Sequence, residues 1–113
     1  PSNLEQLYLY QNRRLTGDIS NWDFSNCTST IDRLSIDHYQ GITPITGNLT
    51  GWTFANDIEI TSFYLRRLSI TYLPLDMSNV NIGNTFAIEY NTSLISNLED
   101  LQVPNNISNF NIK

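Results

Sequence analysis

The sequence is poor in basic residues and in cysteine, and it has no long apolar run. Six Lys and Arg stand against eleven Asp and Glu, a formal net charge of −5. Nucleic-acid binding by a basic face is therefore excluded, because phosphate neutralisation needs clustered cations. The single cysteine, Cys27, cannot form a disulfide within the chain, which excludes a disulfide-stapled scaffold. Because no run of about 18 apolar residues occurs, we expect no membrane-spanning segment.

Clusters of metal-binding and catalytic side chains are also missing from the sequence. The single histidine, His38, follows Asp37, but no recognisable serine or cysteine nucleophile motif accompanies the pair. The histidine, the cysteine and the scattered carboxylates show no metal-ligand spacing. We therefore predict a protein that is not an enzyme and that uses no metal or other cofactor.

Alanine and glutamate are scarce, which argues against a helical repeat. The chain has two alanines and four glutamates, and Asn, Ser and Thr supply most of its polar side chains. Such polar residues are common in stacked β architectures, where side chains of successive layers hydrogen-bond along the stack. We predict mostly strands and turns.

A stretch that begins at Leu15 returns three times along the chain. Residues 15–26 read LTGDISNWDFSN and residues 45–56 read ITGNLTGWTFAN, while looser copies follow at 73–84 and 103–112. Successive copies are 30, 28 and 30 residues apart, which indicates a repeat array whose units bury their apolar faces against each other. The aligned apolar columns are Leu15, Ile45, Leu73 and Val103; Ile19, Leu49, Met77 and Ile107; Trp22, Trp52, Val80 and Phe110; and Phe24, Phe54, Ile82 and Ile112.

The last two columns alternate with the period of a strand, so we predict that this segment of each unit is extended. For Trp22 and Trp52 we favour packing between successive units, and a platform for a ligand is the alternative.

A second pattern precedes each copy. Residues 4–12 read LEQLYLYQN, which follows L-x-x-L-x-L-x-x-N, and the apolar frame recurs at 31–36, 65–70 and 98–103. We place the third strand at Leu68 and Ile70, and the alternative register uses Phe63 and Leu65 instead. Residues 85–90 are expected to form an extra strand before the fourth unit.

The nine-residue frame resembles the leucine-rich repeat family, and LTGDISNWDFSN is similar to bacterial cell-surface tandem repeats with a G-D-I-S-x-W-D-x-S signature. The frame's asparagine is present as Asn12 and Asn106, but Tyr39 and Leu73 replace it in the middle units. The resemblance implies a curved right-handed solenoid with a parallel sheet on its concave face, located outside the cell or at its surface and serving recognition or adhesion.

We therefore predict a β-rich, leucine-rich-repeat-like solenoid of about four coils of 27–34 residues, with a parallel sheet on one face and extended segments on the back. The approximate coils are residues 1–26, 27–56, 57–84 and 85–113, in one array that we expect to be a piece of a longer chain. Neither end carries a capping signature, so we also expect end-to-end self-association.

The outward side chains of the predicted sheet are the candidate binding residues. They mix aromatic, cationic and acidic groups, a composition suited to a protein partner and also to a glycan that stacks on tyrosine. A solvated face in a structural spacer, such as part of a surface appendage or virion fibre, is the alternative. The candidate residues are Gln6, Tyr8, Tyr10, Arg33, Asp37, His38, Arg67, Thr71, Tyr72 and Gln102.

Overall fold

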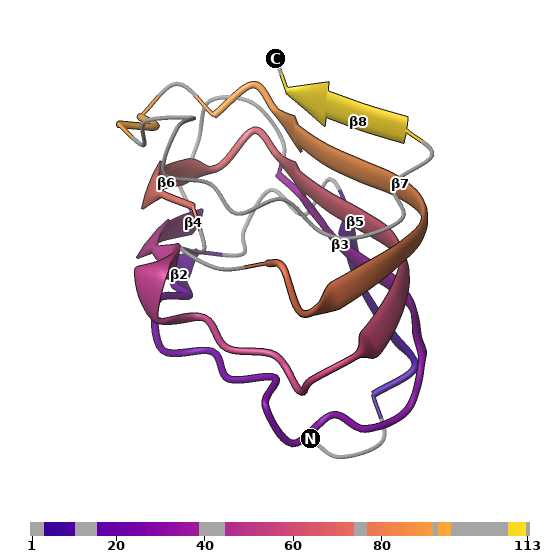
Figure 1. Cartoon of the computed structure of the whole chain (residues 1–113). Helices are drawn as coiled ribbons and strands as arrows, with labels where there is room; N and C mark the ends of the chain where they lie inside the picture. The colour runs from indigo at the N-terminus through magenta and orange to yellow at the C-terminus, as the bar shows by residue number, and fades with distance from the viewer. Residues whose placement is uncertain are drawn as a thin grey trace.

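The computed structural model is strand-rich and contains two parallel sheets (Figure 1). Within the part of the chain that it describes, no helix is both long and apolar enough to cross a membrane. The described residues are 4–10, 16–38, 45–73, 77–91, 93–95 and 109–112.

The main sheet has five parallel strands in the order β1-β3-β5-β7-β8, and the second sheet has three in the order β2-β4-β6. The chain alternates between the two sheets through β6, so strands adjacent in a sheet are not adjacent in sequence. The main-sheet strands are β1 (Gln6–Tyr10), β3 (Ile31–Asp37), β5 (Ile58–Arg66), β7 (Val80–Glu89) and β8 (Asn109–Ile112). The second sheet contains β2 (Gly17–Asp18), β4 (Ile45–Asn48) and β6 (Ser69–Tyr72), and the 3₁₀ turn η1 (Leu49–Gly51) follows β4.

The core lies between the two sheets, which face each other in Figure 1. On the main sheet, Leu34 pairs with Phe63 and Phe63 with Phe86, so three large apolar side chains form one buried row. The rings of Phe63 and Phe86 stack with their centroids 5.2 Å apart. Burial of each such side chain contributes about 1.5–3 kcal/mol. The next buried row along the strands is Ile36, Leu65 and Ile88. The predictions of a strand-rich chain and of a parallel sheet are confirmed.

The predicted register of the third strand is wrong. β5 places Phe63 and Leu65, rather than Leu68 and Ile70, in line with the core residues of β3. The alternating apolar run from Ile58 fills the main sheet, and β5 ends where Arg67 takes a left-handed conformation with φ of 56°. Leu68 and Ile70 are buried beyond this corner, where Ile70 belongs to the second sheet.

Residues 85–90 do not form an extra strand, because residues 85–89 are the second half of β7, the fourth strand of the main sheet. Its first half contains Val80 and Ile82, which pair with Ile58 and Ile60 and not with the back columns. Residues 109–112 are predicted to belong to the back segment of the fourth unit, but they form β8, which pairs with β7 in the main sheet. Both segments lie against a neighbouring main-sheet strand that satisfies their backbone groups. The predicted frame at 98–103 lies outside the described residues.

The corrected register changes which asparagine belongs to the repeat frame. Asn91 follows Phe86 by five residues, as Asn12 follows Leu7, whereas the prediction assigned this place to Asn106. The buried Asn91 amide donates to the carbonyl oxygens of Leu65 and Glu89 at 3.0 and 3.1 Å, and its Oδ1 accepts from the Leu68 N–H at 2.9 Å. This side chain therefore satisfies backbone groups at the corner after β5 and β7.

Candidate functional site

The outward face of the main sheet carries polar and aromatic side chains in rows that cross the strands. Parallel pairing aligns residues of equal register, and alternation along each strand turns them away from the core. The rows are Gln6, Arg33, Ser62, Thr85 and Asn109; Tyr8, Ser35, Tyr64, Ala87 and Asn111; and Tyr10, Asp37, Arg66 and Glu89.

An ion-pair network crosses the last of these rows. Arg66 Nη1 lies 3.2 Å from Asp37 Oδ2, and Arg66 Nε lies 2.8 Å from Glu89 Oε2 in an ion pair without a hydrogen bond. Arg67 Nη1 donates to Asp37 Oδ1 at 2.7 Å, and Asn111 Nδ2 donates to Glu89 Oε1. The Asp37 side chain is only 3% exposed, so loss of its cations would leave an uncompensated buried charge, at a cost of about 3–5 kcal/mol.

An arginine from the first row lies between two tyrosines of the middle row. The Cζ atom of Arg33 lies 4.8 Å from the ring centroid of Tyr8 and 5.6 Å from that of Tyr64. The rings of Tyr8 and Tyr10 stack at 5.6 Å, and these two residues are 49% and 50% exposed. Cations over tyrosine rings are attracted by about 0.5–1 kcal/mol at exposed sites.

A groove of about 190 Å³ opens between these side chains. It brings together the aromatic pair, the ring-flanked arginine and one end of the ion-pair network, which makes it the candidate site on this face. Its lining residues are Tyr8, Tyr10, Arg33, Ser35, Asp37, Tyr64 and Arg66.

The candidate residues from the first two strands lie where the sequence predicts, apart from His38. Tyr8, Tyr10, Arg33 and Asp37 line the groove, and Gln6 is exposed in the row that contains Arg33. His38 follows the end of β3 and is buried, with its backbone N–H bonded to the Arg66 carbonyl oxygen at 3.2 Å.

The candidate residues from the third unit do not lie on strands of the main sheet, because the predicted register of that unit is wrong. Thr71 and Tyr72 belong to β6 of the second sheet, and Arg67 lies at the corner beyond β5, from which it reaches Asp37. Tyr64 and Arg66 take their place on the face. The signal for these two residues was the alternative register with Phe63 and Leu65, since the residues that alternate with that pair point outward. Gln102 lies outside the described residues.

The aromatic columns of the back segment stack as predicted in the first two units. Trp22 and Trp52 lie 6.3 Å apart at 8°, and Phe24 and Phe54 lie 5.4 Å apart at 7°. Trp52 is buried, and its Nε1 donates to the carbonyl oxygen of Ile19 at 2.8 Å. Packing between units, rather than a ligand platform, is therefore the role of Trp52.

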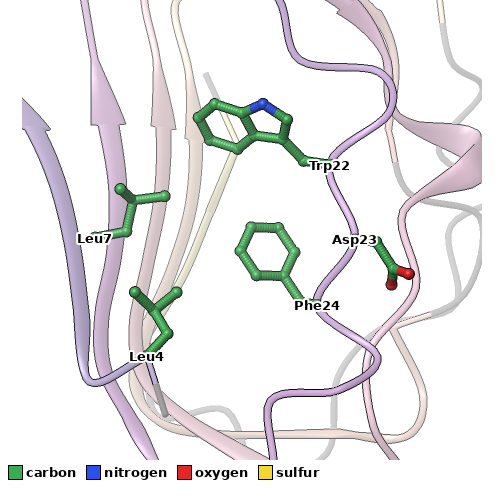
Figure 2. A pocket seen from close by; sticks show the side chains of 5 residues that line it. All are labelled: Leu4, Leu7, Trp22, Asp23 and Phe24. Atoms are coloured by element: carbon green, nitrogen blue, oxygen red, sulfur yellow. The ribbon is translucent and has the colours of Figure 1, made fainter. Parts of the chain in front are cut away.

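The first unit leaves an apolar cavity of about 310 Å³ against β1. Figure 2 shows Leu4 and Leu7 pointing into it from one side and Trp22 and Phe24 from the other, while the Asp23 carboxylate points away. Trp22 is half-buried here, in contrast to Trp52.

The G-D-I-S and G-N-L-T segments of the sequence form matching turns. Asp18 Oδ1 accepts from the N–H of Ser20 at 2.8 Å and from its hydroxyl, and Asn48 Oδ1 accepts from the N–H and hydroxyl of Thr50 at 3.1 and 2.8 Å. The Asn48 N–H then donates to Ser20 Oγ at 2.9 Å, which joins the two turns. Acidic or amide residues in these positions satisfy backbone donors that would otherwise be unpaired.

Hydrogen bonds also lower the pKa values of the two aspartates in the first unit. The Ser20 hydroxyl and N–H lower the pKa of the Asp18 carboxyl below its ordinary 3.8. The Ser25 N–H, the Ser25 hydroxyl and the Thr53 hydroxyl lower that of Asp23. In each case the donors favour the ionised form.

No protein-family model, curated protein or solved structure matches the chain.

The pKa of Asp18 leads to a testable prediction. A carboxyl whose folded-state pKa is depressed stabilises the fold above its unfolded pKa, and this stabilisation is lost as the pH falls through the folded value. Urea midpoints of the native chain should therefore decrease between pH 7 and pH 2.5. Asp18→Asn, which copies the turn at Asn48, should show a smaller decrease, because the amide keeps the acceptor oxygen but has no carboxyl group to protonate.

Asp18→Ala is the matched control, since it removes the acceptor altogether. It should have the lowest midpoint of the three proteins at pH 7. If Asp18→Asn loses as much stability with acid as the native chain does, the turn assignment for Asp18 is wrong.

Proposed function

We propose that this chain is a non-enzymatic recognition module that binds a protein partner through the outward face of its main sheet. In this proposal the two sheets are opposite sides of a leucine-rich-repeat-like solenoid of about four coils, located at a cell surface. In both sheets the strands are arranged in the order in which they occur along the chain, which supports the proposal. A repeated backbone turn also supports it: the carbonyl oxygens of Ile19, Leu49 and Met77 each accept from the N–H of the residue three positions later.

The observation that carries the proposal is the combination of Tyr8, Tyr10, Arg33 and Tyr64 around one groove. Tyrosine and arginine provide much of the energy at protein interfaces, because they bury a large area and still make polar contacts. The two stacked tyrosines are also among the most exposed large apolar residues in the described chain. Contacts to the side chains around this groove would therefore contribute most of the binding free energy.

The size of the groove favours part of a macromolecule over a free small molecule. Pockets for small molecules enclose about 300–1,000 Å³, whereas this groove has about 190 Å³. One side chain of a protein partner fits that volume, and the surrounding sheet supplies the remaining contact area. A glycan that stacks on Tyr10 is the other ligand class, which the experiments below distinguish.

The proposal is tested on an array of purified protein domains, probed with the native chain and with Tyr8→Ala/Tyr10→Ala. We expect the double variant to lose at least tenfold in affinity for the captured partners, while its circular dichroism is unchanged because both side chains are half exposed. The control is Tyr72→Ala, an exposed tyrosine on the second sheet. Partners that bind all three proteins equally would contradict the proposal, as would partners lost equally with Tyr72→Ala.

A second candidate function is that of a structural spacer, which the apolar cavity beside β1 favours. Here the occupant would be a second copy of the chain, stacked on Trp22 and Phe24 in the way that Trp52 and Phe54 already stack from the other side. Burial of aromatic rings in offset stacks would stabilise such a contact.

Under the spacer hypothesis the native chain should form dimers or longer assemblies in light scattering at micromolar concentration. Trp22→Ser should shift it toward the monomer, because it removes the ring that a second copy would cover. A monodisperse native monomer at high concentration would exclude stacking between copies.

A further inference from the structure

Two arginines line the groove, and they differ in what holds them. Arg66 is paired with the carboxylates of Asp37 and Glu89. Within the described chain, the side chain of Arg33 makes neither an ion pair nor a hydrogen bond, and its partners are the rings of Tyr8 and Tyr64. The positive charge of Arg33 is therefore not neutralised by a carboxylate on this face.

The flanking rings also orient the Arg33 guanidinium. With one ring at 4.8 Å and another at 5.6 Å, its side chain is held between aromatic walls. A guanidinium carries five N–H donors in its own plane. Ring contacts use none of these donors, so those of Arg33 remain available to a ligand. A ligand would approach them through the groove, where Ser35 supplies a hydroxyl.

The acidic residue that lines the groove, Asp37, does not compete for Arg33. Asp37 is bound by Arg66 at 3.2 Å and by Arg67 at 2.7 Å, so both of its oxygens are occupied. An incoming anion would therefore meet a carboxylate whose charge is already neutralised.

We propose that Arg33 is the anchor for an Asp or Glu side chain of the protein partner, bound by the edge of the guanidinium between Tyr8 and Tyr64. The proposal rests on the proposed function, since it specifies the chemistry of the partner at the same face. A carboxylate matches the planar fork of arginine with two parallel hydrogen bonds, which are stronger and more directional than a contact to lysine. A polyanion such as nucleic acid is not favoured, because the groove offers one uncompensated cation rather than a cluster.

The experiment measures binding of small probes by NMR. The probes are N-acetyl-glutamate N-methylamide, the matching glutamine compound and glucuronate, each titrated into the native chain, Arg33→Gln and Arg33→Lys. We expect the glutamate probe to shift the Arg33 Nε–H and the ring signals of Tyr8 and Tyr64. The glutamine probe should bind the native chain at least tenfold more weakly, and Arg33→Gln should bind the glutamate probe at least tenfold more weakly. Arg33→Lys should recover only part of that loss, because it keeps the charge but not the fork.

Each other outcome overturns the inference. Equal binding of the glutamate and glutamine probes would exclude a carboxylate anchor. An unchanged Arg33 Nε–H signal on addition of the glutamate probe would exclude it as well. If glucuronate binds at least tenfold more tightly than the glutamate probe in an Arg33-dependent way, the ligand is an acidic glycan and not a protein side chain. If the carboxylate probes do not bind while array partners still depend on Tyr8 and Tyr10, the Arg33 anchor is refuted and the proposed function is not. If the array partners bind Tyr8→Ala/Tyr10→Ala as tightly as they bind the native chain, the proposed function itself is refuted.

Discussion

The parallel register that pairs Leu34 with Phe63 and Phe63 with Phe86 is the constraint on which the rest of the structure depends. Side chains along a strand alternate between the two faces, so a slip of one residue would exchange the core with the surface. Phe63 and Phe86 would then face outward, and Tyr64 would enter the core. Burial of these rings therefore selects one register, and that register determines which side chains reach the outward face.

The same register balances the charges on that face. Arg66 lies between Asp37 and Glu89 only because β5 lies between β3 and β7 with these residues in one row. Two nearly buried carboxylates are tolerated because a neighbouring strand supplies the cation. Arg33 belongs to a different row, and its guanidinium lies between Tyr8 and Tyr64. This separates a residue that holds the fold together from one suited to a partner.

Sequence patterns predicted the strand-rich fold, the stacked pairs Trp22 with Trp52 and Phe24 with Phe54, and the site residues of the first two strands except the buried His38. They failed in the third unit because Phe63 with Leu65 and Leu68 with Ile70 are equally apolar pairs with the same spacing. Only the pairing with β3 determines which of the two pairs lies in the main sheet. The left-handed conformation that separates them is at Arg67 and not at a glycine, so the sequence does not indicate the corner. Tyr64 and Arg66 were missed for that reason, and Glu89 was missed because residues 85–90 were interpreted as an extra strand outside the repeat frame.

The most direct test of this account is a nuclear Overhauser measurement of which side chains touch across the main sheet. The account predicts contacts from the Phe63 ring to Phe86 and to Leu34, together with contacts between Leu65 and Ile88. Contacts from Leu68 to Leu34 and from Ile70 to Ile36 would contradict it. They would restore the other register and remove Tyr64 and Arg66 from the face.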